Sequence, residues 1–191
     1  MLSRQRVKCC FIGDYNVGKT SIMYAFLDKR IDKVQTTLGI DFFSKTIVVN
    51  DQDVYLSLWD TAGSERYRSL MHSYLRDADC IVVVYDTSLR ESNLVHWMRI
   101  AEQHCAKVIG VLGNKTDLTT AFEGDVDELL FPWSRQGKKM VFGTCSSRKP
   151  EQVKSFLKEC LKTLLDQKKE SSIYVAIPLQ TKTHHSNRCC T

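Results

Sequence analysis

The chain has 191 residues, a length sufficient for one well-packed domain, and 43% of the residues are hydrophobic and 26% charged. Its formal net charge of +5 is modest and it carries no block of like charges, which argues against a nucleic-acid-binding protein. The longest apolar stretch, residues 80–85, is far shorter than the roughly 20 residues of a membrane-spanning helix. Lys8 interrupts the apolar run near the N-terminus that a secretory signal would need, so we expect a cytosolic protein.

Strands and helices are predicted to alternate along the chain. Runs of strand length and β-branched content cover residues 7–12, 47–49, 54–59, 80–85, 108–112 and 140–142. Helix-like stretches cover roughly residues 18–28, 64–75, 92–105, 124–136 and 150–168. The alternation predicts an α/β fold with a six-stranded, mostly parallel sheet and helices on both faces.

Three local signals refine this prediction. The short polar segment Asn50-Asp51-Gln52-Asp53 joins the second and third strands, which predicts one antiparallel strand at an edge of the sheet. Pro132 is expected to bend or end the fourth helical stretch. Apolar periodicity fades from residue 169, so we expect one domain over residues 1–168 and a flexible C-terminal tail over residues 169–191.

The cysteines do not indicate a disulfide framework. Cys9, Cys10, Cys80 and Cys145 lie in strand-like apolar runs, where a small buried side chain is the simplest interpretation. The pair Cys189 and Cys190 has no apolar neighbours and needs a separate explanation.

The segment between the first strand and the first helix matches G-x-x-x-x-G-K-[ST], the pattern of a phosphate-binding P-loop. Glycines allow backbone N–H groups to close around phosphate oxygens, the lysine reaches the terminal phosphates, and the final hydroxyl can ligate Mg²⁺. The alternative is a glycine-containing turn with an incidental lysine, but the strand-to-helix context favours the P-loop. The residues predicted to bind nucleotide here are Asp14, Tyr15, Asn16, Val17, Gly18, Lys19, Thr20 and Ser21.

Asp60 follows the third apolar strand, where a carboxylate can hold Mg²⁺ through water. Gly63 permits the backbone to approach the terminal phosphate of a nucleotide. A lone aspartate at a strand end is usually only a cap, but Asp60-Thr61-Ala62-Gly63 follows a P-loop, which favours the metal-binding role.

Asn114-Lys115-Thr116-Asp117 follows another buried strand. The Asp117 carboxylate can accept both the N1–H and the 2-amino group of guanine, a donor pair that adenine lacks, and Lys115 would lie along the base. A site whose polar groups stay unpaired with the wrong base can discriminate by roughly 10⁴ or more. As an isolated tetrapeptide this segment could be a surface turn, but after the two preceding motifs it predicts a guanine nucleotide, GTP or GDP, with Mg²⁺.

Together these motifs resemble a small GTPase of the Ras superfamily, and specifically the Rab family, over about residues 7–147. Residues 37–42 resemble the Rab switch I segment, in which Thr37 closes over Mg²⁺ and the terminal phosphate. Residues 59–70 resemble switch II. The stretch Ser73-Tyr74-Leu75-Arg76-Asp77 is similar to the Golgi-associated Rab branch.

The resemblance implies further site residues. Phe42, Trp59 and Tyr74 would form the aromatic surface by which effectors sense the switch, and the alternative is ordinary core packing. The segment Thr144-Cys145-Ser146-Ser147 falls where the family has its second guanine-contacting loop, with the Ser146 backbone amide facing the base oxygen.

The sequence also departs from the family pattern. Ser64 stands where the family has the glutamine that orients the attacking water, so the predicted catalytic set is Ser64, Lys19 and Thr37, with slow unassisted hydrolysis. Tyr15 is bulkier than the family's usual residue and would crowd an incoming arginine finger. Residues 30–32 lack the family's aromatic contact to guanine and Ser147 replaces the usual lysine, which predicts fast nucleotide release.

The chain closes Arg188-Cys189-Cys190-Thr191, which resembles the paired-cysteine endings of Rabs and implies geranylgeranylation of Cys189 and Cys190. Two lipids matter because one gives only marginal anchoring; an unmodified tail is the alternative.

The resemblance implies a monomer that cycles onto Golgi or endosomal membranes in vesicle transport, with an exchange factor, a GTPase-activating protein, effectors and a prenyl-chaperone. A non-hydrolysing GTP-dependent binding module is the second hypothesis, and a P-loop kinase a disfavoured third.

Overall fold

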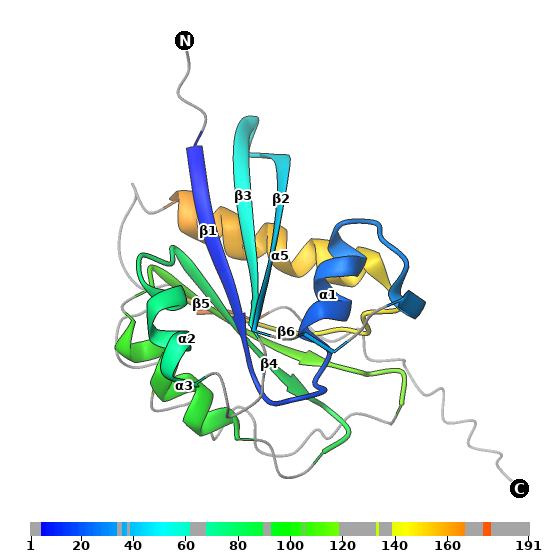
Figure 1. The fold of residues 1–191 in the computed structure, drawn as a ribbon. Coiled ribbons are helices and arrows are strands. Elements are labelled where there is room, and N and C mark those ends of the chain that lie inside the picture. The colour runs from blue at the N-terminus through cyan, green and yellow to red at the C-terminus, as the bar shows by residue number, and fades with distance from the viewer. Residues whose placement is uncertain are drawn as a thin grey trace, which may run out of the picture.

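The computed structural model describes residues 5–33, 36–37, 39–61, 68–89, 93–104, 106–118, 133, 139–166 and 174–176. Within these ranges one sheet holds seven strands in the order β2-β3-β1-β4-β5-β6-β7 (Figure 1). The strands are β1 (Gln5–Ile12), β2 (Ile40–Val49), β3 (Gln52–Thr61), β4 (Cys80–Asp86), β5 (Val108–Asn114), β6 (Lys139–Thr144) and β7 (Tyr174–Ala176). The helices are α1 (Lys19–Phe26), the short 3₁₀ helix η1 (Ile31–Lys33), α2 (Arg68–Leu75), α3 (Leu94–Gln103) and α5 (Pro150–Leu165).

The topology confirms the predicted α/β fold. Only β2 and β3 pair antiparallel among the described strands, at one edge of the sheet, and the other pairs are parallel. Parallel strands end at the same edge, so the carboxyl ends of β1, β3, β4, β5 and β6 lie together there. In open α/β sheets this carboxyl edge is where ligands bind.

Helices cover both faces of the sheet, as predicted, and each face has its own hydrophobic core. Alternate residues of β1 separate the two: Cys9 and Phe11 belong to one core, Cys10 and Ile12 to the other. The first core includes the apolar faces of α1 and α5, and the second those of α2 and α3. Figure 1 shows these two pairs of helices on opposite sides of the sheet.

The predicted hairpin is present, but β2 is much longer than the three residues expected. It starts at Ile40, and its register with β3 runs from Ile40 opposite Thr61 to Val49 opposite Gln52. An edge strand is exposed on more than one side, so polar residues such as Ser44 interrupt the apolar run that marks a buried strand. The prediction of residues 47–49 therefore covered only the C-terminal end of β2, next to the hairpin turn.

The seventh strand was not predicted. Strand β7 lies within the segment expected to be a flexible tail, and it pairs with β6 from Met140 opposite Tyr174 to Phe142 opposite Ala176. Three residues are too few for a period-2 pattern, and the strand forms by adding backbone hydrogen bonds to the free edge of β6. The remainder of residues 167–191 lies outside the described residues.

The helix predictions are confirmed where the structure describes them, and α1 is shorter than predicted at both ends. The predicted helix 124–136 and Pro132 lie outside the described residues, apart from the buried Trp133. Cys9, Cys10, Cys80 and Cys145 are buried free thiols, as predicted. No helix in the described part of the chain is long and apolar enough to cross a membrane.

Candidate functional site

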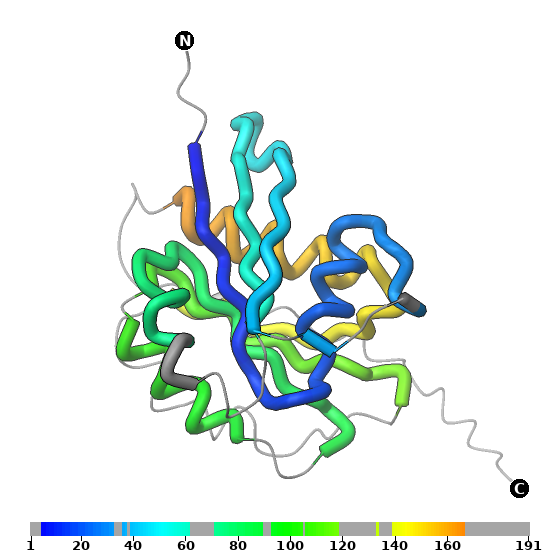
Figure 2. Tube along the Cα trace, in the orientation of Figure 1, coloured from blue at the N-terminus to red at the C-terminus, as the bar shows by residue number. Residues whose placement is uncertain are grey.

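The loop between β1 and α1 is tight and depends on its glycines (Figure 2). Gly13 and Gly18 have φ values of 146° and 93°, and Asn16, with φ 61°, also lies in the left-handed region. A Cβ atom on Gly13 would overlap the Val84 carbonyl oxygen, and one on Gly18 would overlap the side-chain amide of Asn114. Only glycine fits both positions, which is the requirement of a P-loop backbone.

Lys19 opens α1 and is only 6% exposed. Its Nζ donates to the carbonyl oxygens of Gly13 at 3.0 Å and Asp14 at 2.8 Å, so the ammonium lies across the mouth of the loop. Burial lowers the pKa of Lys19 to about 8, against the opposing effect of the Asp60 and Asp14 carboxylates. A buried cation held by neutral carbonyls is well placed to meet an anionic ligand.

The three residues predicted to bind Mg²⁺ converge. The Thr37 hydroxyl donates to Asp60 Oδ2 at 2.9 Å, the Thr20 hydroxyl donates to the same oxygen, and the two hydroxyls are 2.9 Å apart. Asp60 is 0% exposed, and burial raises its pKa although the threonine hydrogen bonds oppose the shift. Its second oxygen, Oδ1, is buried without a hydrogen-bond partner, which fits a cation bound beside it.

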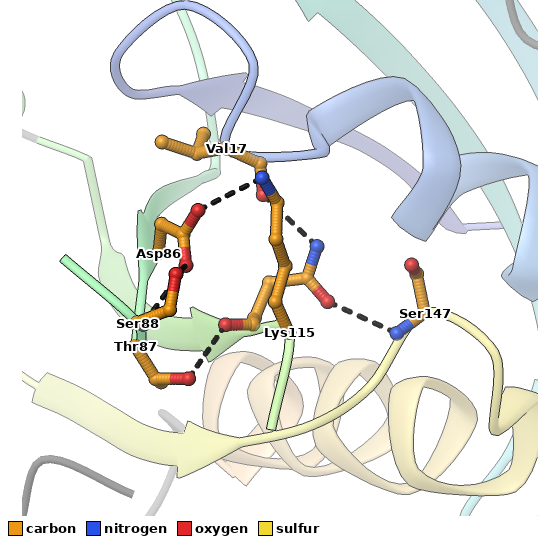
Figure 3. Close-up of polar contacts among 7 residues, drawn as sticks. Val17, Asp86, Thr87, Ser88, Lys115 and Ser147 are labelled. Atoms are coloured by element: carbon orange, nitrogen blue, oxygen red, sulfur yellow. Dashed lines mark hydrogen bonds and ion pairs between the residues drawn. The ribbon is translucent and has the colours of Figure 1, made fainter. Parts of the chain in front are cut away.

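On the other side of the P-loop, Asn114 joins three loops. Its Nδ2 donates to the Val17 carbonyl oxygen at 2.9 Å, and its Oδ1 accepts from the Ser147 backbone amide at 3.0 Å. The Thr87 hydroxyl and backbone amide both donate to the Asn114 carbonyl oxygen at 2.9 Å. Figure 3 shows this set of contacts from the loops after β1, β4, β5 and β6.

Lys115 and Asp86 form an ion pair at 2.8 Å within the same group (Figure 3). Asp86 Oδ1 also accepts from the backbone amide and the hydroxyl of Ser88. Burial raises the pKa of Asp86, but the bonds from Lys115 and Ser88 outweigh it and lower the pKa overall. The ion pair thereby joins Lys115 to the end of β4, and the contact of Lys115 with a base stays a prediction.

Asp117 is held by Ser146, whose hydroxyl donates to Oδ1 at 2.6 Å. This hydrogen bond, more than the Coulombic effect of Arg148, lowers the pKa of Asp117 and keeps it a carboxylate. The Ser146 backbone amide donates to Gln152 Oε1 at 3.0 Å, because the first turn of α5 brings Gln152 next to it. Its contact with the oxygen of a base stays a prediction.

Other predicted residues have different environments. The Tyr15 side chain is 63% exposed, and the Asp14 carboxylate is turned toward α3. The Cys145 thiol is buried 3.8 Å from Asn114 Oδ1 with its pKa raised to about 12 by burial, which marks a packing residue. Gly63 and Ser64 lie outside the described residues.

A sequence model of the Ras family matches residues 8–166 of the chain. The chain belongs to the Ras family. The match spans the P-loop, Thr37, Asp60 and the segment 114–117, and it makes the chain a small GTPase. Ras-family proteins in general bind guanine nucleotide with Mg²⁺, hydrolyse GTP and act with regulators and effectors.

Two of the three aromatic residues predicted to contact effectors lie side by side. The exposed Phe42 ring packs edge-on against Trp59 at 5.3 Å between centroids, and Lys8 Nζ lies 4.6 Å from the Trp59 ring centre. Tyr74 is on α2, and its carbonyl oxygen accepts from the Cys10 thiol. Phe42 and Trp59 are thus in contact, and a role of the three residues in binding effectors stays a prediction.

Sequence reasoning missed several residues of the Ras-family site. Asp86, Thr87 and Gln152 each bond a predicted site residue. Asp86 could have been found, because it follows a buried strand at the same edge as Asp60 and Asn114. Gln152 had no such signal, since it lies inside a helix.

Proposed function

We propose that this Ras-family chain is a Rab-type molecular switch that regulates vesicle transport at Golgi membranes. The observation that carries the switch is the Thr37 hydrogen bond to Asp60 Oδ2 at 2.9 Å. It joins a segment between η1 and β2 to the same carboxylate that holds the P-loop threonine. A ligand at this carboxylate therefore decides whether the Thr37 segment is held or released.

The residues have separate tasks in this proposal. Asp117 and Asn114 would hold guanine, Lys19 would stabilise negative charge on the terminal phosphates, and Thr20, Thr37 and Asp60 would hold Mg²⁺. The bound metal would supply electrostatic stabilisation between phosphate groups. Because Thr37 and Gly63 would both contact the terminal phosphate, its loss on hydrolysis would release both switch segments and with them the surface at Phe42 and Trp59.

Hydrolysis is proposed to be slow without an activating protein. Ser64 is too short to orient a water as glutamine does, and losing a positioned group of this kind costs roughly 10²–10³ in rate. The Tyr15 side chain is 63% exposed, so its bulky ring stands on the P-loop where an arginine finger would enter. These features also support the second candidate, a binding module that recruits effectors while GTP stays uncleaved.

The Rab assignment rests on the residues around the switches and on the tail. The Phe42–Trp59 contact provides an exposed aromatic surface that depends on β2, the strand next to Thr37. Lipidation of Cys189 and Cys190 would attach the protein to the cytosolic face of Golgi or endosomal membranes. Exchange factor, activating protein, effectors and prenyl-chaperone are part of this proposal.

Nucleotide binding is the first test. Fluorescent GDP and ADP analogues should be titrated into purified protein with Mg²⁺, and we expect a preference for GDP of at least about 10⁴-fold. Asp117→Ala should abolish the preference, whereas Asp51→Asn, an equal loss of charge in the β2–β3 turn, should leave it unchanged. Equal affinity for GDP and ADP in the unsubstituted protein would refute the proposal.

Single-turnover GTP hydrolysis separates the two candidate functions. A slow rate that an activating protein accelerates supports the switch, and no cleavage with any activating protein supports the binding module. Ser64→Gln should raise the unassisted rate of hydrolysis.

The membrane location needs a separate test. Imaging of the tagged protein against Golgi and endosomal markers, with a Cys189/Cys190 double serine variant as control, shows which membrane the protein occupies. Mass spectrometry counts the lipids on the two cysteines.

A further inference from the structure

The Asp14 carboxylate connects the P-loop to the start of α3. Its Oδ1 accepts from Trp97 Nε1 at 2.9 Å and from Asn93 Nδ2 at 3.1 Å, and its Oδ2 accepts from the Asn93 backbone amide at 3.1 Å. Asn93 caps α3, and Trp97 lies one turn inside it. Three donors from one helix start therefore hold one P-loop carboxylate, across about 80 positions of sequence.

The direction of this carboxylate matters for a loop that binds phosphate. A carboxylate facing the phosphates would repel them, whereas here both oxygens are occupied by donors from α3. The positive end of the α3 dipole also favours a negative group at this place. The contact thus removes an unfavourable charge from the phosphate side of the loop.

The same residue also holds the P-loop lysine. The Asp14 carbonyl oxygen accepts from Lys19 Nζ at 2.8 Å, next to the Gly13 carbonyl at 3.0 Å. Rotation of the Asp14 backbone would move this carbonyl and break the lysine contact. Side-chain bonds to α3 and the backbone bond to Lys19 therefore restrain the peptide on both sides of Asp14.

Trp97 is suited to be the fixed end of this restraint. It is 3% exposed and packs in the core beneath α2 and α3, so its indole N–H has little freedom to move. A hydrogen bond from a neutral donor to a charged acceptor is stronger than a bond between two neutral groups. Asn93, the second partner of the Asp14 carboxylate, is exposed.

We propose that Asp14, Asn93 and Trp97 form a clamp that positions the P-loop for phosphate, with Trp97 as a positioning residue outside the nucleotide-binding loops. This inference rests on the proposed guanine-nucleotide function and assigns a role to Asn93 and Trp97, which lie on α3 and its N-cap, outside the predicted nucleotide-binding loops. It concerns the phosphates only, because the base is held by the loops after β5 and β6.

The test is Trp97→Phe, which removes the N–H and keeps an aromatic ring. We expect the rate of GDP release to rise about tenfold, equivalent to about 1.4 kcal/mol. The GDP-to-IDP affinity ratio should stay unchanged, because hypoxanthine, the base of IDP, differs from guanine only in lacking the 2-amino group that Asp117 would bind. Asp14→Ala should give a similar increase, and the double variant should release GDP no faster than Asp14→Ala alone.

Trp133→Phe is the matched control. Trp133 is 8% exposed in the same core, and its Nε1 donates to Glu102 Oε2 at 3.2 Å, so the substitution removes an equivalent bond to a carboxylate away from the P-loop. The clamp is refuted if Trp97→Phe releases GDP at the original rate, or if Trp133→Phe accelerates release equally. If Trp97→Phe does not fold, Asp14→Ala decides by the same criterion. Failure of the unsubstituted protein to bind GDP would instead refute the proposed function.

Discussion

Asn114 Nδ2 donates a hydrogen bond of 2.9 Å to the Val17 carbonyl oxygen, across 97 positions of sequence. The bond is buried and joins the loop that would hold the base to the loop that would hold the phosphates. Through Oδ1 the same side chain also fixes the Ser147 amide. Asn114 is therefore a structural link as well as a binding residue, and its two tasks can be separated by experiment.

Asn114→Ala should destabilise the nucleotide-free protein. It leaves the buried Val17 carbonyl and the half-buried Ser147 amide without their partner, and a buried unpaired group costs about 1–3 kcal/mol. We expect the free energy of unfolding in urea to fall by about 2–4 kcal/mol. Gln103→Ala, an exposed truncation at the end of α3, should change it by less than about 0.5 kcal/mol. Equal effects of the two substitutions would show that the link contributes nothing.

Asp60→Asn should uncouple nucleotide release from Mg²⁺. The amide retains an oxygen acceptor for Thr20 and Thr37 but loses the charge that would hold the metal. We expect GDP release with Mg²⁺ to be about as fast as release from the unsubstituted protein after chelation by EDTA. The variant should respond little to EDTA, whereas Asp51→Asn should keep the full response. A variant that still responds fully would remove Asp60 from the metal site.

Much of this site could be predicted because its chemistry requires particular residues at particular strand ends. Gly13 and Gly18 are needed for backbone geometry, and Asp60 and Asn114 follow buried strands that end at one edge. Local patterns of this kind are visible in the sequence alone. The grouping of Thr20, Thr37 and Asp60 follows from the same topology.

Contacts made by side chains across the fold could not be predicted in this way. The bond from Trp97 to Asp14 depends on how α3 packs beside the P-loop, and Trp97 alone looks like any core tryptophan. Gln152 takes the Ser146 amide only because α5 begins three residues after Ser147. Residues 40–46 of β2 were not predicted, because an edge strand does not show a continuous apolar pattern.

Asp51→Gly should stabilise the protein. Asn50 and Asp51 have φ values of 49° and 58°, the left-handed pair of a two-residue type I′ turn, for which Asn-Gly is the favoured sequence. Glycine removes the cost of the left-handed conformation at the second position, although it adds backbone entropy to the unfolded chain. We expect a net gain of about 0.5 kcal/mol in the free energy of unfolding. Asp53→Gly, within β3, should be destabilising, and a stabilising result there would remove the turn geometry as the cause.

His72 and His104 should make stability depend on pH. His72 Nδ1 and His104 Nε2 lie 2.9 Å apart between α2 and the end of α3. At this distance the N–H of one neutral ring donates a hydrogen bond to the unprotonated nitrogen of the other. Protonating both would place two N–H groups against each other. His96 and Arg99 line the adjacent groove of about 270 Å³, together with Met71, Ile100 and Gln103.

Burial first, and then the charge of His72, lower the pKa of His104 in the folded protein. The unfolded chain, with a histidine pKa of about 6.5, therefore binds more protons as the pH falls, and the free energy of unfolding decreases. The contribution is complete above about pH 6.5 and is lost as the pH falls toward the lowered pKa. Urea unfolding at pH 7.5 and about pH 5.5 should show a smaller difference for His104→Gln than for the unsubstituted protein. His96→Gln, which keeps the pair, should retain the original difference; if His104→Gln retains it too, the pair has no part in the pH dependence.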